Sequence, residues 1–236
     1  MEFELYPLGD GAVVIELGKE ISPGVQHMVR VVSALLDQQE AGWLVEYVPA
    51  FTTVTVFYNM ALAASMPGGQ DPFRAVSLEL GKLLRDPGIL DIPKPRVVDI
   101  PVCYGGEFGP DLGFVAQHNG LTPEEVISIH AGGEYDVHMI GFAPGFPYLG
   151  GMSERIAAPR KETPRLKIPV RSVGIAGNQT GIYPIETPGG WQLIGRTPLN
   201  LFLPDEENPS LLRAGDRVRF RPVTEKEYAE LSGGAG

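Results

Sequence analysis

The feature that most constrains the fold is a proline-rich interruption at residues 86–96, DPGILDIPKPR. Each of its three prolines removes a backbone hydrogen-bond donor and restricts the residue before it, so neither a helix nor a central strand continues through the segment. A chain of 236 residues with 43% hydrophobic residues can build a core on each side of such a break. We therefore predict two domains, residues 1–90 and residues 91–236.

The sequence before the interruption predicts the element order β-β-α-β-β-α. Residues 22–39 give a clear helix signal, because Ser22 is suited to the N-cap and Pro23 to the first turn. A compact sheet with both helices on one side is the economical packing for this order. The predicted strands are residues 3–9, 12–18, 43–49 and 52–58, and the second predicted helix is residues 71–86.

The sequence after the interruption changes, from Ser172 onward, to short apolar pieces separated by glycine and proline. Short strands with frequent turns indicate a barrel or a sandwich rather than a parallel sheet. Before them, Thr122 is suited to cap a helix that has Pro123 at its first position. The predicted elements are strands 96–104 and 134–142, helices 110–120 and 122–133, and short strands 172–177, 180–186, 190–195, 199–202 and 216–223.

Composition excludes several classes of function. The formal charge of −10 and the pI near 4.9 argue against nucleic acid or an anionic membrane as a partner, since both favour clustered positive charge.

The single cysteine, Cys103, cannot form an internal disulfide, and we expect a plain buried thiol. No signal peptide or transmembrane run is recognised, so a cytoplasmic location is expected. The histidines lack metal-ligand spacing and the common nucleotide and hydrolase motifs are missing, so no metal site is predicted.

Residues 141–151, GFAPGFPYLGG, raise the main functional question. Four glycines, two prolines and three aromatic residues in eleven positions suit neither a helix nor a regular strand. Such a loop is either a hard turn or the wall of a site. Loop glycines and prolines alone more often signal turn geometry, so the residues that follow the loop have to decide between the two.

A basic block follows the loop after a few residues. Between Arg155 and Arg196 there are seven basic residues and two acidic ones, a local net charge of +5 in an acidic chain. Basic side chains together with glycines that let backbone N–H groups approach an anion indicate recognition of phosphate or carboxylate. Four of the cations come from a segment bracketed by prolines, which lowers the entropy lost in presenting them; these are Arg160, Lys161, Arg165 and Lys167.

Structural interpretations compete with functional ones for several of these residues. Trp191 and Tyr183 lie on strand-like segments and are as suited to a core as to covering a ligand. His138 is either a satisfied core histidine or a group that handles a proton. Gln179 and Thr180 are expected in a turn, where their side chains would bond the backbone.

The motifs GFAPGFPYLGG, SVGIAGNQTGIYPIETPGGWQLIGRTP and AGDRVRFRPV closely resemble the family that contains KipI, the B subunit of 5-oxoprolinase (PxpB) and allophanate hydrolase subunit 1. The opening YPLGDGAVVIELG also resembles that family's N-terminus, so the resemblance covers nearly the whole chain. It implies an α+β fold in which a small α/β N-terminal domain precedes a cyclophilin-like β-barrel. The implied division agrees with the one predicted from the prolines.

The resemblance implies a subunit of an ATP-dependent 5-oxoprolinase complex, which converts 5-oxoproline to glutamate together with an A-type (PxpA-like) and a C-type (PxpC-like) subunit. This chain alone is then expected to be inactive, and whether ATP binds to it stays open. A KipI-like inhibitor of a sporulation sensor histidine kinase is the main alternative. A urea- or allophanate-type carboxyltransferase-related subunit and a prolyl isomerase, suggested by the barrel alone, are weaker ones.

The candidate site residues lie between His138 and Arg196, in and around the motifs that carry the resemblance. Such a reaction needs cations where phosphoryl charge develops and a group that handles a proton. The candidate catalytic residues are His138, Arg160, Lys161 and Arg165. The candidate substrate-binding residues are Phe142, Gly145, Phe146, Tyr148, Gln179, Thr180, Tyr183 and Arg196.

Overall fold

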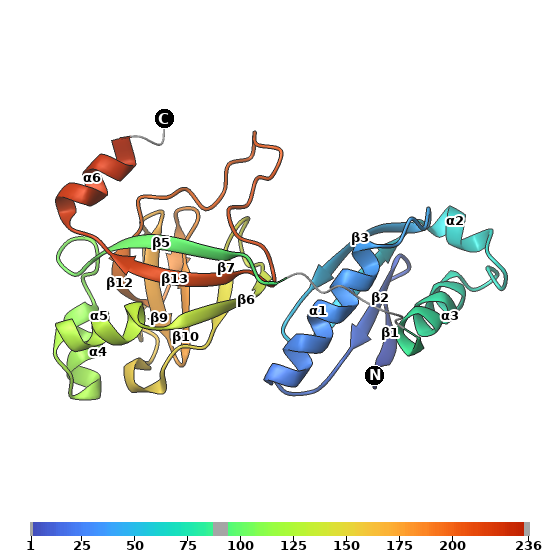
Figure 1. Ribbon diagram of the computed structural model, residues 1–236, viewed down its shortest axis with the longest axis horizontal. Coiled ribbons are helices and arrows are strands. Elements are labelled where there is room, and N and C mark those ends of the chain that lie inside the picture. Colours follow the sequence, from blue (N-terminus) through green and yellow to red (C-terminus); the bar gives the residue numbers. More distant parts are fainter. Residues whose placement is uncertain (1, 87–93, 234–236) are drawn as a thin grey trace. The chain divides into compact units, whose positions relative to one another are not determined.

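The computed structural model describes residues 2–86 and 94–233, and the chain divides into two compact units, Met1–Lys94 and Pro95–Gly236 (Figure 1). The boundary predicted between residues 90 and 91 lies outside the described residues. The fold class is confirmed, because a small α/β unit precedes a closed β-barrel.

The N-terminal unit is an antiparallel sheet of order β1-β2-β4-β3 with the predicted element order. Its helices begin where the sequence indicated: the Ser22 hydroxyl accepts a hydrogen bond from the Val25 N–H, and the Asp71 carboxylate accepts one from the Arg74 N–H. A short extra helix, α2, was not predicted. The elements are β1 (Glu4–Leu8), β2 (Ala12–Glu16), α1 (Pro23–Asp37), β3 (Leu44–Pro49), β4 (Thr53–Tyr58), α2 (Met60–Ala64) and α3 (Pro72–Arg85).

The core of the N-terminal unit lies between one face of this sheet and the two long helices. Alternate strand residues such as Val13, Ile15 and Val56 are fully buried against Val32 of α1 and Leu80 of α3. The two helices lie on the same face of the sheet, as Figure 1 shows. The apolar residues on that face of the strands therefore pack against the apolar faces of both helices in a single core.

The C-terminal unit is built around a closed barrel of order β10-β7-β6-β13-β5-β12-β9. β13 pairs with β5 in parallel and with β6 antiparallel, and β8 and β11 form a separate two-stranded sheet. The elements are β5 (Val97–Tyr104), α4 (Leu112–Asn119), α5 (Pro123–Ala131), β6 (Glu134–Ile140), β7 (Pro147–Gly150), the 3₁₀ turn η1 (Glu154–Ile156), β8 (Arg165–Ile168), β9 (Ser172–Ala176), β10 (Gln179–Ile182), β11 (Thr187–Gly189), β12 (Gln192–Arg196), β13 (Arg217–Pro222) and α6 (Glu225–Gly233).

The barrel wall at β9 is buried on both faces. Val173 and Ile175 point into the main core with residues from the other strands, whereas Ala176 belongs to a second, separate hydrophobic cluster. Since successive side chains of a strand alternate between faces, this second cluster lies on the outside of the barrel wall. Because both faces of the strand are buried, its sequence shows no alternation of apolar and polar residues.

Three local expectations for the C-terminal unit differ from the structure. The second half of the 141–151 loop forms β7, because Pro147 needs no backbone donor at the first position of a strand. Residues 199–202 form no strand and contribute only an isolated bridge from Phe202 to Ser210. Gln179 and Thr180, expected in a turn, lie at the start of β10.

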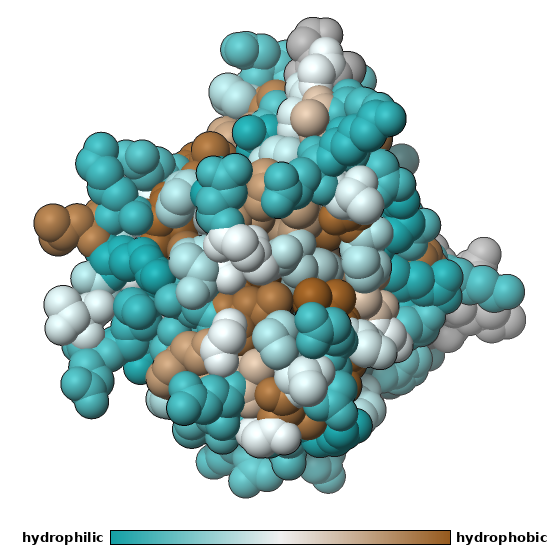
Figure 2. Space-filling model, turned by 90° about the vertical axis from the view of Figure 1, so that its left-hand side faces the viewer, coloured by the Kyte–Doolittle hydropathy of each residue, from teal (hydrophilic) through white to brown (hydrophobic). Residues whose placement is uncertain are grey.

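The surface carries mixed polarity. On the face drawn in Figure 2, hydrophobic residues lie in groups among hydrophilic ones. Within the part of the chain that the structure describes, no helix combines the length and the hydropathy needed to cross a membrane.

Candidate functional site

The second hydrophobic cluster is aromatic and lies under the 141–151 loop. The Phe146 ring contacts those of Tyr148, Tyr183 and Trp191 edge-on, with centroids 5.1, 5.4 and 5.7 Å away. Phe146, Tyr183 and Trp191 are almost fully buried. We call these four residues the outer aromatic cluster; each such pair adds about 0.5–1.5 kcal/mol beyond area burial.

Two facing glycines make room for this cluster. Gly174 of β9 and Gly181 of β10 are cross-strand partners. A Cβ at Gly181 would stand 3.0 Å from the Phe146 ring and 3.1 Å from that of Trp191, and one at Gly174 would stand 3.2 Å from the Trp191 Cβ. The glycines therefore let large rings lie directly on the strand backbone.

The 141–151 loop covers the cluster with an unusual backbone. Phe142 has a φ of 68° although it is a bulky residue, and it is 64% exposed. Its ring contacts Phe146 edge-on at 5.4 Å. Gly145 follows with a φ of 76°, and a Cβ there would stand 2.9 Å from the Leu201 carbonyl oxygen, so the position requires glycine. An exposed ring is thus held on top of a buried aromatic cluster.

The segment from Arg160 to Arg165, here called the basic segment, is fixed beside the same cluster. The Lys161 N–H donates to the Gly190 carbonyl over 2.7 Å, and the Gln192 side-chain amide donates to the Pro159 carbonyl over 2.9 Å. Burial raises the pKa of Tyr183 to about 12, while the positive charge of Arg160 opposes that rise, so Arg160 acts on the cluster electrostatically.

Asp111 joins the basic segment to the barrel wall. Its carboxylate accepts hydrogen bonds from Arg165 Nη2 at 2.8 Å and from the Leu193 N–H at 2.7 Å, and Lys161 Nζ lies 3.5 Å away. Burial works against the charge of Asp111, but the hydrogen bonds and positive charges around it outweigh burial and lower the pKa of the carboxyl. Lys161 and Arg165 are therefore partly neutralised within the chain.

Sequence reasoning missed Asp111. Its position just before α4 is typical of a helix N-cap, yet its side chain makes no capping hydrogen bond. Nothing near Asp111 in the sequence points to the basic block. Its partners Lys161, Arg165 and Leu193 lie 50, 54 and 82 residues further along the chain.

His138 lies at a bulge between β6 and β7. The register shifts between Val137 and Met139, so His138 is the extra residue of β6. Its ring packs on Gly150, where a Cβ would come within 1.8 Å of Nε2. Burial lowers the pKa of His138, and the charge of Asp136 opposes this. The bulge places the histidine ring against β7, which contributes Tyr148 to the outer aromatic cluster.

The remaining predicted residues do not join this group. Thr180 is fully buried and bonds His130 and the Gly174 carbonyl inside the unit. Gln179 is half-buried and pairs with Ala176. The Arg196 guanidinium stacks over the Phe108 ring at 5.8 Å. The structure thus brings together Phe142, Gly145, Phe146, Tyr148, Arg160, Lys161, Arg165 and Tyr183, while the ring of His138 packs on Gly150 at the end of β7.

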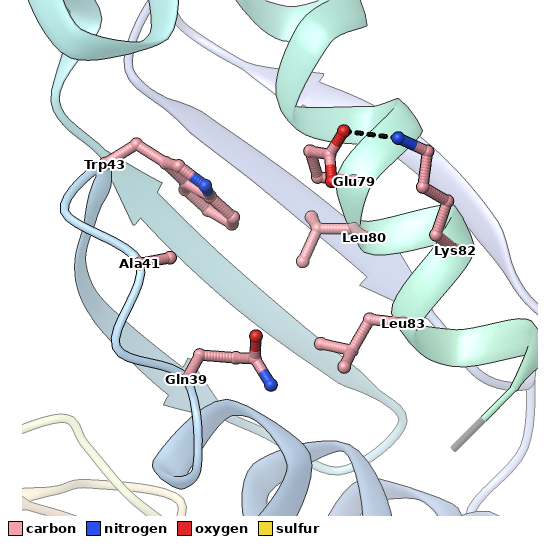
Figure 3. A pocket seen from close by; sticks show the side chains of 7 residues that line it. All are labelled: Gln39, Ala41, Trp43, Glu79, Leu80, Lys82 and Leu83. Atoms are coloured by element: carbon pink, nitrogen blue, oxygen red, sulfur yellow. Dashed lines mark hydrogen bonds and ion pairs between the residues drawn. The ribbon is translucent and has the colours of Figure 1, made fainter. Parts of the chain in front are cut away.

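The N-terminal unit has a pocket of its own, which contains none of the predicted residues (Figure 3). Trp43 faces Leu80 and Leu83 of α3 across it, and Glu79 and Lys82 form an ion pair of 2.6 Å at its side. Exposed ion pairs of this kind contribute little to stability.

An α/β unit followed by a closed barrel, with cations and aromatic rings gathered on the outside of the barrel wall, defines a two-domain α+β protein. The chain belongs to the family described as carboxyltransferase domain, subdomain C and D, which matches residues 3–212.

Relatives named as the B subunit of 5-oxoprolinase are similar over nearly the whole chain. The protein of that name from Bacillus subtilis (strain 168) is 53% identical, with 97% of this chain and 96% of the relative covered. The one from Escherichia coli O157:H7 is 41% identical, with 93% and 96% covered.

A solved structure with the same fold is TTHA0988, with a TM-score of 0.74 and 36% identity; 90% of this chain and 40% of that chain are covered. This chain therefore spans less than half the length of that protein. The urea amidolyase of K. lactis has a TM-score of 0.74 at 19% identity, which shows the shared fold only.

Proposed function

We propose that this chain is the B subunit of an ATP-dependent 5-oxoprolinase and acts with an A-type and a C-type subunit. The observation that carries the proposal is the 53% identity to a protein named as that subunit, over almost the full length of both chains.

The chemistry asks for cations and a shaped wall. The lactam of 5-oxoproline is a poor electrophile at neutral pH, and ATP supplies a phosphoryl group that turns the carbonyl oxygen into a leaving group before water attacks. Positive charge placed where phosphoryl charge develops stabilises that step. Arg160, Lys161 and Arg165 are the residues that supply it in this proposal, and Phe142 with the outer aromatic cluster shapes the wall beside them.

The residues present fit a single phosphoryl or carboxylate group. Arg165 Nη1 is buried and has no hydrogen-bond partner among the described residues, so an oxygen anion would satisfy it. His138, with its lowered pKa, is a neutral imidazole near pH 7 and is thus able to accept a proton. No contact between this chain and the adenine end of ATP is proposed.

The test is glutamate release from 5-oxoproline and ATP by the A- and C-type subunits, with and without this chain. Release only in the presence of this chain is expected, and no release from the chain alone. If a verified, assembled complex releases no glutamate, the proposal fails, and a kinase-inhibitor role becomes the better explanation of the exposed Phe142.

The double substitution Arg160→Ala and Arg165→Ala tests the cations. We expect assembly to persist and kcat to fall by roughly 100-fold or more, because charge stabilisation of the transition state is lost. The matched control is Arg217→Ala with Arg219→Ala, which removes two arginines from the Glu134 network on β13 of the same barrel. Equal turnover of the two double variants would contradict the anion role.

A further inference from the structure

We propose that Asp111 is a positioning residue that orients Arg165 and Lys161 toward the anionic group of the substrate. The inference rests on the proposed function, because it deepens the role of the basic segment. Asp111 itself touches no substrate in this scheme. It acts through the two cations that it holds beside the outer aromatic cluster.

The hydrogen bonds of Asp111 fix both its own position and that of Arg165. Its backbone N–H donates to the Leu193 carbonyl over 2.8 Å, while its carboxylate accepts from the Leu193 N–H over 2.7 Å. This two-bond ring ties the start of α4 to β12, at a residue two positions after Trp191. The remaining carboxylate oxygen accepts from Arg165 Nη2, so the planar guanidinium is oriented by a group that two hydrogen bonds hold to β12.

The charges around Asp111 do not cancel. One buried carboxylate faces Lys161 and Arg165, and Arg160 stands beside them with an exposed side chain. Arg165 uses one terminal nitrogen for Asp111, and its other terminal nitrogen, Nη1, is buried without a partner among the described residues. A guanidinium N–H left unsatisfied is unfavourable, and an anionic oxygen that reaches it removes that penalty. The Asp111 group therefore keeps one guanidinium donor of Arg165 unsatisfied within the described part of the chain.

The capping position of Asp111 supports a role outside the helix. An aspartate before a helix normally accepts a hydrogen bond from the first turn, which stabilises the helix by about 1 kcal/mol. The Asp111 side chain forgoes that bond and turns to the basic segment instead. The hydrogen bond to Arg165 thus takes the place of the missing capping hydrogen bond.

The barrel offers a matched control in Asp216. This carboxylate is as buried as that of Asp111, pairs with Arg96 at 2.5 and 3.1 Å, and accepts the Arg213 N–H at 2.8 Å. Asp216 thus has the same chemistry of one arginine and one backbone donor, and its carboxylate bonds none of the predicted site residues. A purely structural role for Asp111 makes the two aspartates equivalent.

The experiment compares Asp111→Asn and Asp216→Asn in the assembled complex. Asparagine keeps an acceptor for the backbone N–H but loses the charge. We expect both variants to assemble and to lose similar thermal stability. For Asp111→Asn we expect kcat for glutamate release to fall roughly 10- to 100-fold with KM changed by less than about 3-fold. A misplaced cation weakens the stabilisation of the transition state more than it weakens substrate binding. Asp111→Glu should recover part of the loss.

A second readout keeps the inference separate from the proposed function. Inorganic phosphate, added to the chain in thermal unfolding, should raise the midpoint of the wild type and of Asp216→Asn but not of Asp111→Asn. Charge alone predicts the opposite, since removing a carboxylate leaves more net positive charge. If the wild-type complex releases no glutamate, the proposed function fails while the phosphate comparison still tests Asp111. Equal kcat for both variants, or a wild type with neither turnover nor phosphate stabilisation, overturns the inference.

Discussion

At the scale of single residues, His130 shows how a buried polar group is satisfied inside the barrel. It is fully buried between Tyr104 and Thr180. The Thr180 hydroxyl donates its only proton to the Gly174 carbonyl, so it accepts from His130 Nε2–H, and Nδ1 in turn accepts from the Tyr104 hydroxyl. A neutral imidazole satisfies every member of this chain of hydrogen bonds.

A pH dependence of stability follows. Burial lowers the pKa of His130 to about 3, below the value near 6.5 of an unfolded histidine. Between these values the unfolded state binds more protons than the folded state, so stability falls as the pH falls. The loss is about 2 kcal/mol between pH 6.5 and pH 5.

The substitution His130→Gln tests this by urea unfolding at several pH values. The variant should be less stable at pH 7 but should lose less stability on acidification than the wild type. His118→Gln, which removes an exposed histidine from α4, is the control. A variant that retains the full wild-type slope would show that the slope arises elsewhere.

At the scale of elements, the helices α1, α3, α4 and α5 were predicted, whereas the helices α2 and α6 and the short strands β7, β8 and β11 were not. Helix starts depend on a few adjacent residues, and the cap at Ser22 and the capping box at Thr122 lie where the sequence places them. β7 was missed because proline and glycine within residues 141–151 argue locally against a strand, whereas pairing with β6 and β10 comes from distant residues. Asp111 was missed for the same reason, since its partners are fixed only by the closed barrel.

Two helix caps of the same chemistry give a prediction at this scale. Thr122 caps α5, which buries Val126 and His130, and Thr224 accepts the Glu227 N–H at α6, which buries none of its residues. Thr122→Ala should destabilise the chain by about 1 kcal/mol, because fraying of α5 uncovers the core. Thr224→Ala should change global stability by less than about 0.5 kcal/mol. Chemical denaturation measures both, and equal losses would contradict the dependence on packing.

At the scale of the whole molecule, each unit has its own core. The main barrel cluster draws only on residues of the second unit, and the sheet–helix cluster only on residues of the first. The presence of two units was expected from the prolines, but local sequence patterns could not predict the strand order of the barrel, because a parallel β13–β5 pair joins strands more than 100 residues apart.

Separate cores predict two separable unfolding transitions, and the two tryptophans allow each to be followed. Trp43 packs against the core of the first unit, and Trp191 belongs to the outer aromatic cluster of the second. In a Trp191→Phe background, fluorescence reports the first unit, and in a Trp43→Phe background it reports the second.

The fully buried Ile15 and Ile175 supply the perturbation, one in each core. Replacing either by valine should destabilise its own unit by about 0.5–1.5 kcal/mol. Ile15→Val should then lower the urea midpoint seen by Trp43 and leave the one seen by Trp191 unchanged, and Ile175→Val should do the reverse. If either substitution moves both midpoints equally, the two units unfold as one cooperative body in spite of their separate cores. The proline-rich interruption would then separate two segments of sequence but not two unfolding transitions.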